Sequence, residues 1–304
     1  MFTKASVLFL HALTSIHPGS GSELGLVDLP VQREKHTGYP KIDGSSLKGA
    51  IRAAVEANSK SGPGNNRQET LERIFGKADA NDSHAGAVSF SDARVLLFPV
   101  RSLKGVFAWV TCPHVLKRFE HELAAYGTTY ELGSFSFPLP DAGTISSERL
   151  AIKAQEQGYK VVLAEYTFEV MISPECQQLA GFLGSTVFPY LGSEFTDRLV
   201  VLDDDAFVDF VSMFTEVNAR IKINAETGTV DPDAGALWYE ENIPPETVFY
   251  SFCFAGNERT TKREDCWSAE QVMDYMKAQD NLPEVFQLGG NSTIGRGMVR
   301  RIWL

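Results

Sequence analysis

The chain has 304 residues, of which 43% are hydrophobic and 22% are charged, a composition that excludes disordered, collagen-like and membrane-spanning chains. Its length suits one elaborated domain or two ordinary ones. The formal net charge is -11, from 28 Lys and Arg residues against 39 Asp and Glu residues. Such a charge repels polyanions at long range, so taken as a whole it argues against a protein that coats nucleic acid unspecifically.

The N-terminus and the cysteines indicate a soluble, cytoplasmic protein. Lys4 precedes an apolar run, but His11 interrupts this run and no small-residue cleavage site follows, so residues 7–10 fit a buried strand better than a signal peptide. No apolar stretch approaches the ~18 residues of a membrane helix. The cysteines form no C-x-x-C pair, which favours small buried side chains in a reducing compartment over a zinc site. They are Cys112, Cys176, Cys253 and Cys266.

Apolar patterning in the N-terminal half predicts strands and helices in turn. A strand at residues 5–13 precedes a loop rich in Gly, Ser and Pro that is too long to be a simple connection. Helical spacing from Leu47 to Val55 predicts a helix with Ser45 or Ser46 as its N-cap, which ends at the Gly-Pro-Gly of residues 62–64. The other elements expected here are a helix at 68–75, strands at 88–98 and 105–110, and a helix at 114–126.

The C-terminal half continues this alternation. Short extended segments at 220–224 and 236–239 enclose Gly228 and Pro232, which predicts a projecting hairpin. The order of elements favours an α+β fold with ferredoxin-like βαβ units, and no repeat of 20–50 residues is visible. The remaining predicted elements are strands at 160–172, 198–202, 247–254, 285–288 and 298–304, and helices at 176–183, 204–214 and 268–278.

Counting charge by segment changes the meaning of the net charge. Residues 31–60 carry six basic and three acidic residues, a net charge of +3, and residues 286–304 carry three arginines and no acidic residue, again +3. The acidity therefore lies mainly in the middle of the chain. Two basic terminal segments that met in the fold would form a local surface for RNA phosphates on an acidic body.

The first motif, Gly44 to Gly49, opens the first predicted helix. Backbone N–H groups at a helix N-terminus, together with the Ser45 and Ser46 hydroxyls and Lys48, favour contact with phosphate. The motif is not a Walker A loop, because Lys48 precedes the second glycine. Ser45 and Lys48 also satisfy the S-x-x-K pattern of serine acyl enzymes, although S-D-N and K-T-G are missing. Simple helix capping is the remaining alternative.

Two further segments carry chemical potential. Residues 288–297 contain four glycines, which let another backbone approach closely and expose N–H groups to an anion. No helix can follow them, so they are not a dinucleotide-binding loop, and a tight hairpin without a ligand is the alternative. In the early loop, His17, Glu23 and Asp28 suit proton transfer or a metal ion at a phosphodiester, against the alternative of solvated or capping groups.

Four segments agree, in order, with one family. They are residues 13–52, which contain V-D-L-P at 27–30, R-I-K-I-N-A-E-T-G at 220–228, G-A-L-W-Y-E-E at 235–241 and G-G-N-S-T-I-G-R-G at 289–297. In these segments the chain resembles the RAMP proteins of type III CRISPR effector complexes, and more narrowly the backbone subunit of the type III-B (Cmr) complex. The agreement spans the whole chain, which makes it far more specific than any single motif.

The resemblance implies an architecture. A single RAMP domain would cover residues 1–304, with a modified ferredoxin-like (RNA-recognition-motif-like) core that carries lid and thumb insertions. It would contain an active-site loop at residues 14–44, a thumb hairpin at about 225–240, and a glycine-rich loop with the terminal strand at 286–304.

The resemblance also implies roles for single residues. Asp28 matches the family's catalytic aspartate and would bind a divalent metal ion, Mg²⁺ or Mn²⁺, or act as a base, while His17 or Glu240 would handle a second proton. Asn242 stands where family members often have tyrosine, so no ring acts there. Residues implied to contact RNA are Ser45, Ser46, Lys48, Arg52, Gly289, Gly290, Asn291, Ser292, Thr293, Gly295, Arg296, Trp238 and Tyr239.

The implied function is a backbone subunit that polymerises along guide RNA with copies of itself and other Cmr-complex subunits. It would cleave complementary target RNA at regular intervals in antiviral defence, as a divalent-metal-dependent endonuclease. Each thumb would displace one target base, which frees the sugar so that its 2′-OH lines up with the adjacent phosphorus. The alternative is a non-catalytic scaffold on guide RNA, and a serine acyl enzyme is a third, distant reading.

Overall fold

The computed structural model describes most of the chain. The described residues are 1–23, 25–58, 66–77, 83–130, 132, 137–153, 158–224, 226–230, 237–259 and 265–304, with backbone only at 66 and 67. The predicted helix end at residues 62–64, the loop residue Leu24 and the Pro232 turn lie outside them.

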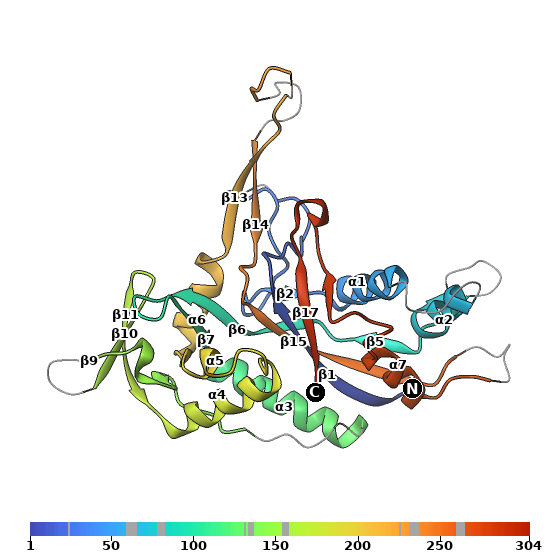
Figure 1. Cartoon of the computed structure of the whole chain (residues 1–304), viewed down its shortest axis with the longest axis horizontal. Helices are drawn as coiled ribbons and strands as arrows, with labels where there is room; N and C mark the ends of the chain where they lie inside the picture. The colour runs from blue at the N-terminus through green and yellow to red at the C-terminus, as the bar shows by residue number, and fades with distance from the viewer. Residues whose placement is uncertain are drawn as a thin grey trace.

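A large mixed sheet forms the body of the molecule (Figure 1). Its strands follow the order β16-β17-β1-β15-β6-β7-β12-β8-β11-β10-β9, with β2 and β5 paired off this path. The N-terminal strand β1 (Phe2–Ala12) lies between β15 (Val248–Gly256) and β17 (Met298–Trp303) and is antiparallel to both. The two ends of the chain therefore share one sheet, and the strands predicted at residues 5–13 and 298–304 are both present.

Helices and the remaining strands cover and extend this sheet. The helices are α1 (Gly44–Ala57), α2 (Asn66–Phe75), α3 (Pro113–Tyr130), α4 (Pro174–Thr186), α5 (Ser193–Thr196), α6 (Asp204–Met213) and α7 (Ala269–Lys277), with short 3₁₀ turns at Glu148–Leu150 and Ser292–Ile294. The strands are β2 (Lys41–Ile42), β3 (Gly76–Lys77), β4 (His84–Ala85), β5 (Val88–Phe90), β6 (Ala93–Arg101), β7 (Phe107–Thr111), β8 (Thr144–Ile145), β9 (Ile152–Lys153), β10 (Tyr159–Leu163), β11 (Tyr166–Ile172), β12 (Leu199–Val201), β13 (Glu216–Ile221), β14 (Leu237–Asn242) and β16 (Val285–Gln287).

Both faces of β1 are covered. Residues 6–12 are all buried, whereas a strand with one wet face would alternate. On one face the Phe9 ring lies 5.8 Å from the Phe119 ring of α3. Because successive side chains of a strand point to opposite faces, Leu8 and Leu10 face the other side, where α7 packs on β1 and β15. Helices on both faces keep the loop that follows β1 on a rigid base.

The hairpin of β13 and β14 projects from the body (Figure 1). The sequence predicted extended segments at residues 220–224 and 236–239, but the paired strands begin earlier, at Glu216, and end later, at Asn242. Ala219 pairs with Tyr239, and the exposure of β13 residues alternates, as expected for a ribbon with solvent on one face. Of the predicted thumb at 225–240, residues 225 and 231–236 lie outside the described residues.

Two predicted single strands are each two strands. Residues 160–172 form the antiparallel hairpin of β10 and β11, which turns at Ala164 with a φ of 50°. Residues 88–98 divide into β5 and β6. The sequence missed the first turn because Ala164 and Glu165 carry none of the Gly, Pro or Asn signals that mark turns.

The cysteine prediction is right for three of four side chains. Cys112, Cys176 and Cys253 are buried, and burial raises the pKa of the Cys112 thiol to about 12. Cys266 is exposed, so the prediction of a buried side chain is wrong there. Over the part of the chain that the structure describes, no helix combines the length and apolar character that a membrane crossing needs.

Candidate active site

Three segments that are far apart in sequence meet at the base of the projecting hairpin. They are the loop at residues 14–44, strand β14 and the glycine-rich segment at 288–297, which lie side by side in Figure 1. Leu29 forms a parallel bridge with Glu240, and the Gly290 N–H donates to the His17 carbonyl at 2.9 Å. The sequence-predicted catalytic residues are therefore brought together.

Asp28 lies where the loop pairs with β14. The Tyr239 N–H donates to Asp28 Oδ2 at 2.7 Å, while the Leu29 N–H donates to the Tyr239 carbonyl at 3.1 Å. The Glu23 N–H donates to the Asp28 carbonyl at 3.0 Å. An open cavity beside the Asp28 carboxylate is lined by Ser22, Glu23, Asp28, Leu29 and Trp238. The carboxylate is thus fixed in orientation and accessible from solvent.

His17 lies on the other side of the same junction. Its Nδ1 is 2.6 Å from the Glu241 carbonyl, a contact in which the ring nitrogen donates, so Nε2 is the acceptor of the neutral ring. A Cβ at Gly19 would lie 2.8 Å from His17 Nε2, which explains the glycine there. The ring is held in one tautomer with its second nitrogen directed toward the loop.

Glu240 is a buried joint between the hairpin and the glycine-rich segment. It is 4% exposed, and its Oε1 accepts from Asn291 Nδ2 at 2.8 Å and lies 3.3 Å from Arg220 Nη2 and 3.6 Å from Arg296 Nη1. Burial acts to raise the Glu240 pKa, but the hydrogen bonds from Asn291, Asn242 and Arg220 outweigh it and hold the pKa below its usual range. The group is therefore an ionised carboxylate at neutral pH.

The glycine-rich segment packs on the chain's own backbone. Gly289 has a φ of 86°, and a Cβ there would lie 2.6 Å from the His17 carbonyl oxygen. The close approach to another backbone that the sequence predicted is therefore seen at His17, and contact of Gly289 and Gly290 with guide RNA stays a prediction. The exposed members of this segment are Gly289, Gly290, Ser292, Thr293, Ile294 and Gly295.

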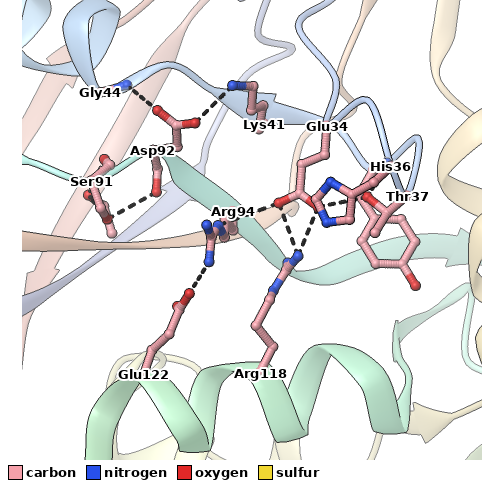
Figure 2. Close-up of polar contacts among 12 residues, drawn as sticks. Glu34, His36, Thr37, Lys41, Gly44, Ser91, Asp92, Arg94, Arg118 and Glu122 are labelled. Atoms are coloured by element: carbon pink, nitrogen blue, oxygen red, sulfur yellow. Dashed lines mark hydrogen bonds and ion pairs between the residues drawn. The ribbon is translucent and has the colours of Figure 1, made fainter. Parts of the chain in front are cut away.

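The start of α1 differs from its prediction. The helix begins at Gly44 with Asp43 as its N-cap residue, so neither Ser45 nor Ser46 is the cap, and both serines are exposed. Asp92 Oδ1 accepts the Gly44 N–H at 2.9 Å, and Asp92 Oδ2 pairs with Lys41 Nζ at 2.8 Å (Figure 2). Lys41 Nζ also lies 2.7 Å from Asp43 Oδ1. The Asp92 carboxylate thus already accepts the hydrogen bond of one of the N–H groups that the sequence assigned to phosphate.

Lys48 turns away from the helix start. Its ammonium group donates to the Val88 carbonyl at 3.0 Å, and burial together with nearby Arg52 lowers its pKa. The side chain is half-buried, as is Arg52. The S-x-x-K reading needs Lys48 to act on Ser45, and the observed contact with Val88 gives it no support.

Trp238 and Tyr239 are neighbours on β14 and point to opposite faces of the hairpin. Trp238 lines the cavity beside Asp28, whereas Tyr239 is 40% exposed on the other face. Of the two aromatic rings assigned to displaced bases, Trp238 is therefore the one next to the candidate carboxylate.

A buried ion-pair network anchors the end of the active-site loop (Figure 2). Glu34, 7% exposed, accepts from Thr37 at 2.7 Å and from Arg118 of α3 at 2.8 and 3.0 Å. Arg94 of β6 lies 3.5 Å from Glu34 and also pairs with Glu122 of α3. These contacts join the loop to the main sheet and α3.

Glu241 and Arg33 form a second anchor that sequence reasoning missed. Arg33 Nη2 lies 2.5 Å from Glu241 Oε1, and Glu241 is 6% exposed. The sequence held one signal for this anchor, the second glutamate of W-Y-E-E. Because consecutive side chains of a strand point to opposite faces, the two glutamates of this motif face opposite sides of the strand.

Asp28 and Glu23 are the carboxylates at this site that could hold a divalent metal ion. Among the residues that the structure describes, no three His, Cys, Asp or Glu side chains cluster as a metal site. Asp28 and Glu23 line the same cavity. Mg²⁺ is commonly held by one or two carboxylates with substrate phosphates and water, so Asp28 can serve as a ligand once a phosphodiester supplies further oxygens.

Comparison with known proteins gives the family. A model of the RAMP superfamily matches residues 9–300. The chain belongs to the RAMP superfamily. Among RAMP proteins, the CRISPR system Cmr endoribonuclease Cmr4 of Pyrococcus furiosus is 38% identical over 304 aligned residues, covering 98% of this chain and 95% of the relative.

Solved RAMP structures have the same fold. The crystal structure of oligomeric Cmr4 from Pyrococcus furiosus gives a TM-score of 0.68 at 30% identity, covering 99% of this chain and 98% of that one. The type III-B Cmr-beta complex, solved by cryo-electron microscopy bound to cognate target RNA, contains a chain with a TM-score of 0.72 at 22% identity, over 99% and 98% of the two chains. The predicted α+β class is confirmed.

Proposed function

We propose that the chain is a backbone subunit of a type III-B CRISPR effector complex that lies along guide RNA and cleaves complementary target RNA. The observation that carries the proposal is the Asp28 carboxylate, fixed by the Tyr239 N–H at 2.7 Å beside an open cavity. It occurs in a chain 38% identical to a protein named for endoribonuclease activity.

A ferredoxin-like core is part of this proposal. Strands β17, β1, β15 and β6 are neighbours in this order, and each adjacent pair is antiparallel. With α1 after β1 and α7 after β15, these elements follow the order β-α-β-β-α-β, which supports a ferredoxin-like core. The projecting hairpin would be the thumb, and the segments from β7 to β12 the lid.

Cleavage needs little chemistry from the protein. Attack of a ribose 2′-oxygen on the adjacent phosphorus forms a P–O bond and breaks the bond to the 5′-oxygen, which leaves a 2′,3′-cyclic phosphate and a 5′-OH. Asp28 would accept the 2′-OH proton, and His17, as the protonated ring, would donate to the leaving 5′-oxygen. In the alternative to this base role, Asp28 would hold a divalent ion together with phosphate oxygens, and the ion would supply positive charge at the phosphorus.

The hairpin would create the geometry for this attack. A nucleotide displaced beside Trp238 can stack on the indole, which frees its sugar to align the 2′-oxygen with the phosphorus. Base pairing between guide and target would set the sequence, and the protein would contact the backbone. Glu240, buried among Asn291 and two arginines, has the contacts of a positioning group, and proton transfer by Glu240 stays a prediction.

Guide-strand contacts are proposed for the exposed serines at the start of α1 and the exposed part of the glycine-rich segment. Arg52 and Arg296 would add positive charge, and Lys48 would do so only if its contact with Val88 opens. The chain would bind guide RNA, target RNA, copies of itself and other Cmr subunits. We place it in the cytoplasm, with the defence function that the family resemblance implies.

A cleavage assay tests the proposal against the scaffold alternative. The chain is assembled with guide RNA and its partner subunits, supplied with Mg²⁺ or Mn²⁺, and given end-labelled complementary RNA. We expect products at regular intervals that carry 2′,3′-cyclic phosphate, and loss of cleavage with retained target binding in Asp28→Ala. Binding without cleavage by the wild-type complex would support the scaffold. Unchanged cleavage by Asp28→Ala would contradict the assignment of Asp28.

Chelation tests the metal separately. If Asp28 shares a divalent ion with RNA, EDTA should stop cleavage while guide and target remain bound, and added Mg²⁺ or Mn²⁺ should restore it. Undiminished cleavage in EDTA would remove the metal from the proposal and leave Asp28 as the base.

A further inference from the structure

The segment that follows Asp28 is attached to a single buried carboxylate. Glu241 Oε2 accepts the Val31 N–H at 2.9 Å, and Oε1 pairs with Arg33 Nη2 at 2.5 Å. Glu241 is 6% exposed, so these contacts form out of water, where charged hydrogen bonds are stronger. One side chain therefore holds the loop at two points that lie three and five residues after Asp28.

The same carboxylate reaches the other strand of the hairpin. Thr215, just before β13, donates its hydroxyl to Glu241 Oε1 at 2.7 Å. Arg33 also donates from Nη1 to the Gly38 and Val211 carbonyls at 2.8 and 3.0 Å, so the guanidinium cannot follow Glu241 if the carboxylate moves. The pair is thus a rigid joint between the loop, β14 and the segment that enters β13.

The backbone of Glu241 contacts both halves of the candidate site. Its N–H donates to the Leu29 carbonyl at 3.0 Å, and its carbonyl accepts from His17 Nδ1 at 2.6 Å. Leu29 follows Asp28 directly. A shift of Glu241 would therefore move Asp28 and the His17 ring together.

Glu240 and Glu241 point to opposite sides of β14 and hold different segments of the candidate site. Glu240 holds Asn291 of the glycine-rich segment, whereas Glu241 holds Arg33 and Val31 of the active-site loop. Consecutive residues of a strand project in opposite directions, so each glutamate can fix only one of these two segments.

We propose that Glu241 is a positioning residue for RNA cleavage, which acts by holding Asp28 through the Val31 and Arg33 contacts. The inference rests on the proposed catalytic role of Asp28. Glu241 touches no reacting atom: it is buried, and both of its oxygens already accept hydrogen bonds. Its effect is on orientation, where an error of about 1 Å can lower a rate by about 100-fold.

The test compares Glu241→Gln with Glu258→Gln in the assembled complex. Glu258 is a close match because its residue is 7% exposed, it pairs with Arg73 at 3.2 Å and it accepts the Trp267 N–H at 3.1 Å, in a region of α2, β15 and α7 away from the site. Both variants lose the charge of a buried ion pair and keep the side-chain size.

We expect Glu241→Gln to bind target RNA with wild-type Kd and to cleave it about 10- to 100-fold more slowly in single turnover at saturating target. The fraction of bound target RNA that is finally cleaved should equal that of wild type, and only the rate should be lower. A merely unstable subunit would lower the cleaved fraction instead. The pH dependence of the rate should keep its wild-type shape, since Glu241 transfers no proton. Glu258→Gln should lower thermal stability and cleave at the wild-type rate.

Other outcomes contradict the proposal. A wild-type rate for Glu241→Gln, or an equal slowing in Glu258→Gln, would overturn it, and so would a loss of amplitude at unchanged rate. An altered pH profile would make Glu241 a proton-transfer group instead. The Asp28→Ala complex distinguishes failure of the proposed function from failure of this inference. If that complex still cuts RNA, the proposed function fails. An inactive Asp28→Ala complex, together with a wild-type cleavage rate in Glu241→Gln, overturns this inference alone.

Discussion

The Tyr239 N–H donates a hydrogen bond to Asp28 Oδ2 at 2.7 Å, across 211 positions of the sequence. The donor belongs to the backbone of β14, so the contact depends on the path of the hairpin and not on the tyrosine ring. The position of the Asp28 carboxylate is therefore coupled to the position of the proposed thumb. Any RNA that displaces the base of the hairpin also changes the position of Asp28.

Replacement of Glu240 tests the joint between the hairpin and the glycine-rich segment. Glu240→Gln removes a buried charge from beside Arg220 and Arg296, so we expect a loss of about 3 kcal/mol in the free energy of unfolding. The control is Glu165→Gln, whose partner Arg101 lies 3.6 Å away on the exposed surface, where such pairs contribute about 0–1 kcal/mol. Urea denaturation of the isolated chain measures both, and equal effects would contradict the buried joint.

Acidification tests the Glu34 network. Burial acts to raise the Glu34 pKa, but hydrogen bonds and charges from Thr37, Arg118 and Arg94 hold it below the ordinary value of 4.5. A depressed folded-state pKa stabilises the protein above the ordinary value and loses that contribution as the pH falls through the folded pKa. At pH 7 Glu34→Gln should cost about 3 kcal/mol. The gap between wild type and variant should narrow below pH 4.5, and a constant gap would argue against the network.

A glycine pair tests the packing on His17. Gly289 and Gly295 both have positive φ, 86° and 79°, so alanine costs each about 1–2 kcal/mol of backbone strain. Only at Gly289 would the added Cβ strike the His17 carbonyl, at 2.6 Å, whereas nothing lies within 4 Å at Gly295. Gly289→Ala should therefore unfold at lower urea concentration than Gly295→Ala. Equal midpoints would show that the glycine segment does not pack on His17 in solution.

The sequence predicted most elements because their signals are local. The helix α7 is the clearest case: Ser268 and Gln271 form a capping box, and the predicted range of 268–278 contains the observed Ala269–Lys277. The 160–172 hairpin was missed because its turn uses Ala164 in a left-handed conformation without a glycine. A left-handed backbone conformation at an alanine cannot be predicted from the residue types of the turn.

The site was predictable only in part, for a related reason. Asp28, His17 and Glu240 stand in recognisable motifs, so their roles could be proposed from sequence. The Arg33 and Glu241 pair joins residues 208 positions apart, and the direction of each side chain depends on strand register, which motifs do not specify. The same limit hid the contact of Lys48 with Val88.

The most direct test of the account is single-turnover cleavage by complexes that carry Asp28→Asn. Asparagine keeps an oxygen that can accept the Tyr239 N–H, so the loop should stay in place while the charge and the base are lost. We predict wild-type guide and target binding, with cleavage about 100- to 10,000-fold slower. Cleavage of complementary RNA at the wild-type rate and with the wild-type spacing would contradict the account.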